Sequence, residues 1–353
     1  MNPERILIVR LSAIGDVIHA LPCLNALRTA FPDAYIAWVV ENIAADILYN
    51  HPQIDDVFII PKKRWRKFKP GIWLNELMPF IRMLRSKQFD VAFDFQGLTK
   101  SSIISRAADA RVRVGFGGED GREFSKLVNN TKIVPPASAI HVVERNFSLL
   151  SALGITGDIP EPVIPIDPDA VVYIKEFLDR KNPDNKPLIS IQPGAGWTTK
   201  QLPLETYAEL TNLIREHLDY QVIYTWGPGE EAMIQALATM AHKRGAAPLV
   251  APPTTLRQLV ALVKACSMIV GGDTGPVHLA SALGIPVVAI YGSSDAKRNA
   301  PYTTKLRLFQ RTELPCVPCW KTKCPLDGDD HLRCLRSIIP GELFNGIRAL
   351  LHA

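Results

Sequence analysis

Residues 267–291 read SMIVGGDTGPVHLASALGIPVVAIY, and this stretch indicates the fold. Ser267 to Gly271 is a short apolar run that suits a buried strand. A glycine-rich turn follows, and Pro276 occupies the position that proline favours at the start of a helix, so Pro276 to Gly284 is predicted as a helix. Pro286 to Tyr291 is a second apolar run. Strand, helix and strand in this order are typical of a βαβ unit in a parallel sheet.

The same alternation of short apolar runs and helical segments extends over both halves of the chain. In the second half we predict two further strands and three helices: Pro187–Gln192 and Gln221–Trp226, then Pro203–Leu218, Glu230–Arg244 and Pro340–Leu351. In the first half we predict four strands: Arg5–Arg10, Tyr35–Val40, Asp56–Ile60 and Asp90–Phe95. Leucines 21, 24 and 27 lie at helical spacing, and Trp73–Arg85 is predicted as a helix.

A proline-rich stretch separates the two halves. Residues 157–168 contain four prolines, which favour extended chain over a regular core element. We therefore predict an N-terminal domain over residues 1–160, a C-terminal domain over 161–340, and a final helix in 341–353 that can pack back on the N-terminal domain. Each domain is expected to be a doubly wound, Rossmann-like α/β domain, with ligands beyond the carboxyl ends of its strands.

Composition narrows the class of protein. A chain of 353 residues is long enough for two domains, and 47% hydrophobic and 21% charged residues are ordinary for a globular protein. The net charge of +5 suits an anionic ligand better than a nucleic-acid partner. Neither a signal peptide nor a run of 18 apolar residues is evident, so a cytoplasmic protein is expected.

The turn at Asp273, Thr274 and Gly275, with His278 one turn later, is the strongest functional signal. Free backbone N–H groups and the positive end of the dipole at a helix start suit phosphate oxygens. A helix capped by Asp273 or Thr274 is the alternative. Because capping alone does not need two glycines, an aspartate, a threonine and a histidine together, we favour a binding site.

The loop Leu11–His19, directly after the first strand, is the second candidate. Gly15 permits a tight bend, and Asp16 falls at the ligand edge of the N-terminal sheet. Asp16 is a general base or a helix N-cap, and its position favours neither interpretation.

Further charged candidates follow other strands. In the loop Gly194–Lys200, Lys200 can neutralise a diphosphate, and Thr198 and Thr199 offer hydroxyl groups. The basic segment Pro61–Lys67 can bind an anionic acceptor or an anionic membrane surface, although charge runs are usually solvated loops. Individually weaker candidates are Lys100, Arg122, His141, Glu144 and Arg145.

Several motif matches are not taken as sites. Gly227–Ala232 matches the dinucleotide fingerprint G-x-G-x-x-A, but Pro228 removes a backbone donor and no acidic residue follows about 20 positions on. The pairs Asp167/Asp169 and Asp327/Asp329 follow no strand, so no catalytic metal is expected. One C-x2-C pair lies in a cluster of four cysteines: Cys316, Cys319, Cys324 and Cys334. These cysteines are free thiols, form a disulfide or hold a structural metal.

In combination, these loops resemble those of the bacterial ADP-heptose:lipopolysaccharide heptosyltransferases (glycosyltransferase family 9), most closely the heptosyltransferase I type. The resemblance covers nearly the whole chain and rests on six segments: 12–19, 63–67, 95–100, 141–145, 226–230 and 273–278. It implies a GT-B fold, in which two Rossmann-like domains face a central cleft. It also implies inverting, metal-independent transfer of heptose from ADP-L-glycero-D-manno-heptose to the inner core (Kdo or heptose) of lipopolysaccharide, without a cofactor.

The resemblance also assigns roles. Asp16 resembles the general base, Lys200 the lysine that meets the donor phosphates, and Glu230 or Glu231 the acid that meets the ribose. The predicted donor-binding residues are Thr199, Lys200, Trp226, Gly227, Glu230, Asp273, Thr274, Gly275 and His278. The predicted acceptor-binding residues are Ser12, Gly15, Arg64, Arg66, Lys100, Arg122, His141 and Arg145.

A lipid A–Kdo acceptor implies peripheral contact with the inner membrane. Three alternatives remain open: a GT-B enzyme that uses another nucleotide sugar, a nicotinamide-dependent dehydrogenase built on Gly227 and Gly229, and a non-catalytic protein that binds lipopolysaccharide precursors.

Overall fold

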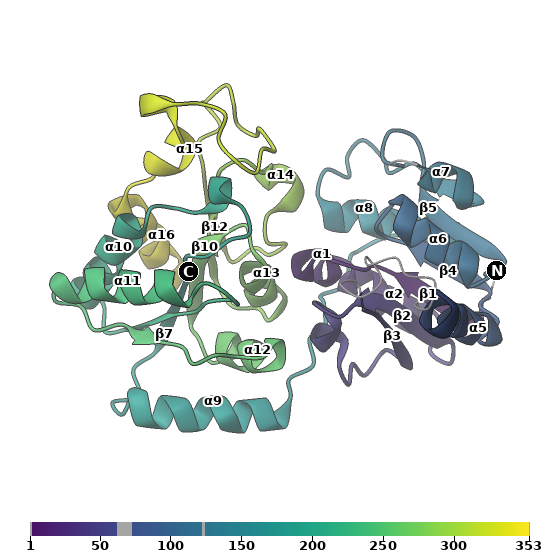
Figure 1. Ribbon diagram of the computed structural model, residues 1–353, viewed down its shortest axis with the longest axis horizontal. Helices are drawn as coiled ribbons and strands as arrows, with labels where there is room; N and C mark the ends of the chain where they lie inside the picture. Colours follow the sequence, from purple (N-terminus) through teal and green to yellow (C-terminus); the bar gives the residue numbers. More distant parts are fainter. Residues whose placement is uncertain (1, 62–72, 122–123, 353) are drawn as a thin grey trace. The chain divides into compact units, whose positions relative to one another are not determined.

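The computed structural model describes residues 2–61, 73–121 and 124–352. The chain divides into two compact units, Met1–Pro165 and Ile166–Ala353, each built around its own parallel sheet (Figure 1). The unit boundary falls inside the proline-rich stretch, five residues beyond the boundary predicted from the sequence. Because residues 160–167 belong to no helix or strand, this stretch connects the units as extended chain.

The first unit contains a six-stranded sheet in the order β3-β2-β1-β4-β5-β6, with every pairing parallel. This is the Rossmann order, in which successive strands are added in one direction along the sheet from β1 to β3 and in the other direction from β4 to β6. The strands are β1 (Arg5–Val9), β2 (Tyr35–Glu41), β3 (Asp56–Ile60), β4 (Val91–Asp94), β5 (Val112–Phe116) and β6 (Thr131–Ile133). The helices are α1 (Ile14–Ile18), α2 (Leu21–Ala30), α5 (Met78–Ser86), α6 (Thr99–Ala107), α7 (Ser125–Val128) and α8 (Val142–Ser148).

The second unit repeats this topology. Its strand order is β12-β11-β10-β7-β8-β9, and every pairing is again parallel. The direction in which strands are added along the sheet changes between β9 and β10, so that β10 pairs with β7. The strands are β7 (Leu188–Gln192), β8 (Gln221–Tyr224), β9 (Leu249–Val250), β10 (Met268–Gly272), β11 (Val287–Tyr291) and β12 (Leu306–Gln310). The helices are α9 (Pro168–Lys181), α10 (Leu204–His217), α11 (Glu231–Lys243), α12 (Leu256–Lys264), α13 (Gly275–Ala282), α14 (Ala296–Asn299), α15 (Arg333–Arg336) and α16 (Pro340–Leu351).

Alternate residues of the second sheet face opposite helix layers. On β8, Val222 and Tyr224 belong to the core formed with α10, α11 and α16, whereas Ile223 packs with α9 and α12. Figure 1 shows these two helix groups on either side of the sheet. The prediction of two doubly wound α/β domains is therefore confirmed.

Every strand predicted from the sequence is present, but four were missed. β9 has only two residues, β6 has three, and β5 and β12 alternate with arginine, as in Leu306-Arg-Leu-Phe-Gln310. All four lie at or next to a sheet edge, where a strand needs less apolar surface than in the centre. Short polar edge strands carry a weak sequence signal for this reason.

The final helix, α16, contributes to the core of the second unit. Leu343, Phe344 and Ile347 of α16 are buried there, next to α10 and β12. The apolar face of the helix is therefore covered by its own unit. Within the described part of the chain, no helix is long and apolar enough to cross a membrane.

Candidate functional site

The loops singled out in the sequence follow the strands between which the strand order of each sheet reverses. Leu11–His19 follows β1, Gly194–Lys200 follows β7, and the turn at Asp273 follows β10. Open α/β sheets bind ligands at these reversal points, because the loops diverge there and leave space beyond the strand ends. The topology therefore places each group of candidate residues where a ligand is expected.

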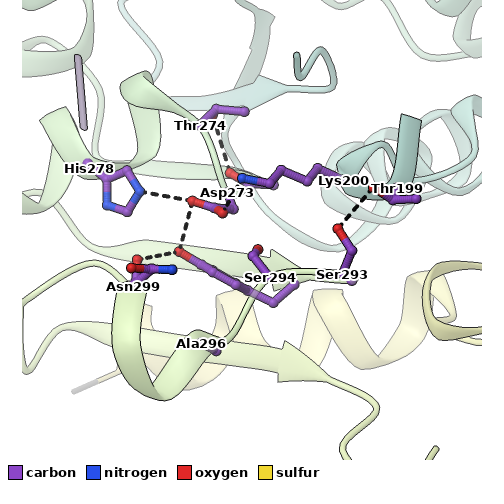
Figure 2. Close-up of polar contacts among 12 residues, drawn as sticks. Thr199, Lys200, Asp273, Thr274, His278, Ser293, Ser294, Ala296 and Asn299 are labelled. Atoms are coloured by element: carbon purple, nitrogen blue, oxygen red, sulfur yellow. Dashed lines mark hydrogen bonds and ion pairs between the residues drawn. The ribbon is translucent and has the colours of Figure 1, made fainter. Parts of the chain in front are cut away.

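Asp273 is the centre of the cluster in the second unit (Figure 2). Its carboxylate accepts a hydrogen bond from Lys200 Nζ at 2.5 Å and lies 3.1 Å from His278 Nε2. Lys200 Nζ also lies 4.5 Å from the centre of the Trp197 ring. The predicted donor-binding residues Lys200, Asp273 and His278 are thus brought together from two loops that lie 73 residues apart.

The electrostatics keep Asp273 ionised. Burial of Asp273 by itself raises its pKa, but the hydrogen bond and charge of His278, together with Lys200, outweigh burial and hold the pKa well below its ordinary value. Tyr291, which sequence reasoning missed, donates its hydroxyl hydrogen to the Asn299 carbonyl at 2.8 Å and lies 3.4 Å from Asp273 Oδ1. Burial, followed by the charge of Asp273, raises the pKa of Tyr291.

The start of α13 lies beside this cluster. Thr274 is its N-cap residue, but its side chain makes no capping hydrogen bond and donates instead to the Gly272 carbonyl at 3.2 Å. Of the two capping alternatives, position therefore favours Thr274, yet the usual side-chain cap is missing. The first N–H groups of a helix have no intrahelical acceptor, so this turn offers donors to a ligand.

Glycine at position 272 allows the Lys200 loop to approach the end of β10. A Cβ atom at Gly272 would lie 2.5 Å from the Lys200 carbonyl oxygen. Gly292, after β11, likewise faces the Thr199 carbonyl and the Leu335 side chain. The Thr198–Lys200 turn therefore lies in backbone contact with the ends of two strands, which side chains at these glycines would prevent.

Glu230 closes a neighbouring turn. Its carboxylate accepts a hydrogen bond from the Gly227 N–H at 2.8 Å, and Gln192 Nε2 lies 3.4 Å away. The Trp226 indole donates to the Ala251 carbonyl at 2.8 Å. Because Glu230 occupies the Gly227 amide, that amide is not presented to a ligand as a dinucleotide fingerprint requires.

In the first unit, Asp16 lies in the first turn of α1. Its carboxylate pairs with Arg10 Nη2 at 2.6 Å and accepts a hydrogen bond from the Ala13 N–H at 3.0 Å, while the side chain remains 43% exposed. Asp16 is therefore not the N-cap residue, which is Ala13, although it does accept the N-cap amide. A fixed, accessible carboxylate at a strand end is suited to accept a proton.

Sequence reasoning missed Arg10. Its side chain is buried at the end of β1, and besides Asp16 it donates to the Phe95 carbonyl. A charged residue directly after the buried run Ile6–Val9 is the signal that was available, since such groups are seldom buried without a partner.

The predicted acceptor residues are more scattered. Lys100 Nζ lies 3.2 Å from the buried carboxylate of Glu41, and Arg145 pairs with Asp120. His141 caps α8, and its ring meets the His19 ring edge-on, with centroids 5.5 Å apart. Ser12 and Gly15 are partly buried in the loop that carries Asp16. Arg64, Arg66 and Arg122, with the rest of the basic segment beyond Pro61, lie outside the described residues.

The four late cysteines line one small hollow together with Thr199 and Ser293. All four are free thiols, and burial, followed by the charges of the other three, raises the pKa of Cys334 to about 11. Among residues 2–61, 73–121 and 124–352, no group of three or more His, Cys, Asp or Glu is arranged to hold a metal ion.

Two Rossmann-type sheets in one chain, each with polar groups where its strand order reverses, are the architecture of the GT-B fold. The model of glycosyltransferase family 9 (heptosyltransferase) matches residues 77–329, more than half of the chain. The chain belongs to this family, and the protein is a glycosyltransferase, as the sequence resemblance implied.

Similarity to individual relatives extends over most of the chain. The lipopolysaccharide core heptosyltransferase OpsX of Haemophilus influenzae is 28% identical over 304 residues, which are 85% of this chain and 82% of that protein. Lipopolysaccharide heptosyltransferase 1 of Pseudomonas aeruginosa is 29% identical over 364 residues and covers 99% of this chain and 98% of that protein. The structure of the E. coli heptosyltransferase WaaC with ADP has a TM-score of 0.76 and 26% identity, over 98% of this chain and 99% of that one.

Proposed function

We propose that this protein transfers heptose from ADP-L-glycero-D-manno-heptose to the inner core of lipopolysaccharide, with Kdo or heptose as the accepting sugar. Membership of the heptosyltransferase family supports the reaction type. The relatives named as lipopolysaccharide heptosyltransferases support the acceptor class, and the ADP in the WaaC structure supports the donor base.

One observation carries the donor assignment: Lys200 and the uncapped first turn of α13 meet at Asp273. The diphosphate lies at this turn in the proposal, where backbone N–H groups and the helix dipole attract its oxygens. Lys200 has three N–H donors, so it can keep its bond to Asp273 and still reach a phosphate oxygen. Asp273 repels the diphosphate little, because the Lys200 ammonium group offsets its charge.

The nucleoside lies toward β8 in this proposal. Gly227 and Trp226 border the turn that Glu230 closes, and one carboxylate oxygen of Glu230 is already held by the Gly227 amide. The other oxygen is the acceptor for a ribose hydroxyl. A side chain at Gly194 would displace this carboxylate, because a Cβ atom there would lie 2.1 Å from Glu230 Oε1.

The chemical step needs one base and one stabilised leaving group. Asp16 accepts the proton of the acceptor hydroxyl while that oxygen forms a bond to the anomeric carbon. The bond from the anomeric carbon to the diphosphate breaks on the opposite face, so the configuration inverts and ADP leaves. Lys200 and the α13 dipole stabilise the added negative charge in place of a metal.

The acceptor binds the first unit in this proposal, and its anionic groups are bound by basic side chains of that unit: Arg64, Arg66, Lys100, Arg122, His141 and Arg145. The reaction in this proposal excludes water, which would otherwise hydrolyse the donor. A lipid-linked acceptor brings the protein to the inner face of the inner membrane.

Nucleotide selectivity tests the donor assignment. Calorimetric titration with ADP, UDP, GDP and NAD in the presence of EDTA is expected to show a clear preference for ADP without a divalent metal. A preference for UDP or GDP would keep the transferase class and discard the heptose donor. Binding of NAD alone would overturn both the function and the donor site, and a requirement for metal would overturn the metal-free mechanism.

Asp16→Ala tests the chemical step. We expect kcat to fall at least about 100-fold, because a positioned base contributes this much or more, while the Kd for ADP stays within twofold. The exposed Asp33 of the same unit supplies the control, since Asp33→Ala should change neither quantity. Equal losses of ADP binding and turnover in Asp16→Ala would exclude the assigned role.

A further inference from the structure

The proposed function leaves the cysteine-rich segment Cys316–Cys334 without a role, although it lies against the donor loop. The hollow lined by its four cysteines is also lined by Thr199 and Ser293. Thr199 directly precedes Lys200 in the chain, so contacts that fix Thr199 also fix the backbone position of the lysine.

Hydrogen bonds tie the Lys200 turn to this segment at two positions. Thr199 Oγ1 donates to the Lys321 carbonyl at 2.6 Å, and Thr198 Oγ1 donates to the Thr322 carbonyl at 3.1 Å. These partners lie more than 120 residues apart in the sequence. The cysteine-rich segment therefore holds the outer side of the turn.

Ser293, after β11, completes the connection. Its hydroxyl donates to Thr199 Oγ1 at 2.9 Å (Figure 2), and its carbonyl accepts from the Trp320 N–H at 2.8 Å. The Ser293 N–H donates in turn to the Thr199 carbonyl at 3.3 Å. Through its hydroxyl, N–H and carbonyl groups, Ser293 thus joins the Lys200 turn and the cysteine-rich segment just beyond the end of β11.

Thr199 is only 2% exposed and Ser293 only 1%. The Thr199 hydroxyl donates its single hydrogen to Lys321 and accepts one from Ser293, so its bonds point into the protein. The Thr199 hydroxyl therefore holds Ser293 and Lys321, and its contact with the donor stays a prediction.

We propose that Thr199 is a positioning residue for the donor, and that the cysteine-rich segment sets the position of Lys200 through it. Gly272 and Gly292 let the turn approach the strand ends from one side, and Lys321 and Thr322 hold it from the other. Lys200 is thereby kept within reach of Asp273 and of a diphosphate at the start of α13. This inference rests on the proposed function, since it takes Lys200 as the group that meets the donor phosphates.

A double-mutant cycle on ADP affinity tests it. Thr199→Val keeps the shape and removes the hydroxyl, and should raise the Kd for ADP about 10-fold, which corresponds to the loss of a buried hydrogen-bonded group. In a Lys200→Ala background, Thr199→Val should change the Kd less than twofold. Thr199→Ser, which keeps the hydroxyl, should restore affinity to near the wild-type value.

Thr211 supplies the matched control. It is equally buried, donates to the Tyr207 carbonyl at 2.8 Å and lies 2.7 Å from the Tyr224 hydroxyl, within the core of the same unit. Thr211→Val should lower stability without changing the Kd for ADP. Equal effects of Thr199→Val and Thr211→Val on the Kd, or full additivity of Thr199→Val with Lys200→Ala, would overturn the proposal.

Hydrogen exchange separates this inference from the proposed function. Thr199→Val should speed amide exchange at Lys200, Ser293 and Trp320, and Thr211→Val should not. Unchanged exchange at these amides would overturn the link to the cysteine-rich segment, whatever the nucleotide result. If the wild-type protein bound no nucleotide, the proposed function would fail, and the exchange rates would still decide whether Thr199 holds this turn.

Discussion

At the residue scale, the proposed reaction depends on the ion pair of Arg10 and Asp16. Arg10 bridges Asp16 and the Phe95 carbonyl, so it holds the carboxylate at the end of β1. Arg10→Met should lower kcat roughly 10- to 100-fold, because a misplaced base loses much of its contribution, and leave the Kd for ADP unchanged. Steady-state kinetics and calorimetry measure the two effects. Arg28→Met removes another arginine that binds carbonyl groups of this unit, and a similar fall in its kcat would contradict the prediction.

Asp273 makes stability depend on pH at the same scale. Its pKa in the folded protein lies below that of an unfolded aspartate, about 3.9, so the folded state favours the ionised form. This stabilisation is complete above about pH 5 and is lost as the pH falls below 4. Asp273→Asn should cost about 3 kcal/mol of unfolding free energy at pH 7, and the gap to wild type should narrow below pH 4. Urea unfolding at several pH values measures this difference in unfolding free energy. Asp179→Asn, at an exposed ion pair, should differ little from wild type at any of these pH values.

At the scale of elements, the packing of the Lys200 turn against β10 depends on a missing side chain. A Cβ atom at Gly272 would lie 2.5 Å from the Lys200 carbonyl oxygen, so Gly272→Ala must displace the turn. We expect a loss of about 1–3 kcal/mol in stability, as for other overpacked sites, and at least a 10-fold weaker affinity for ADP. Gly341→Ala is the control, because its Cβ atom would meet no other atom within 4 Å and alanine favours the helix. Unchanged ADP affinity in Gly272→Ala would show that the turn need not lie where the structure has it.

At the scale of the whole molecule, the two units have separate cores and separate sheets. Lys200, Asp273, His278 and Glu230 all belong to the second unit. A fragment of residues 166–353 should therefore fold cooperatively by itself and bind ADP within about fivefold of the full chain's affinity, while having no transferase activity. Circular dichroism during urea unfolding and calorimetry test this. A fragment that is unfolded, or that is folded but does not bind ADP, would contradict the assignment of the donor to this unit alone.

Local patterns were sufficient for the central strands and the order of helices, because burial on both faces of a parallel sheet demands continuous apolar runs such as Ile6–Val9 and Met268–Gly272. The same reasoning singled out Asp16 and Asp273 as candidates, since ligands of such sheets bind at the loops after the strands. The strands β5, β6, β9 and β12 were missed because they lie at or next to a sheet edge, where a strand needs little apolar surface.

The sequence by itself therefore determined two Rossmann-like domains, the loops that follow their inner strands, and most of the charged residues in those loops. Only the tertiary structure decided that Arg10 holds Asp16, that Thr199 binds the cysteine-rich segment, and that α16 remains with the second unit. The physical reason is the range of the contacts. Strand and helix signals arise from neighbours a few residues apart, whereas Thr199 meets Lys321 across 122 residues, and no local pattern encodes such a meeting.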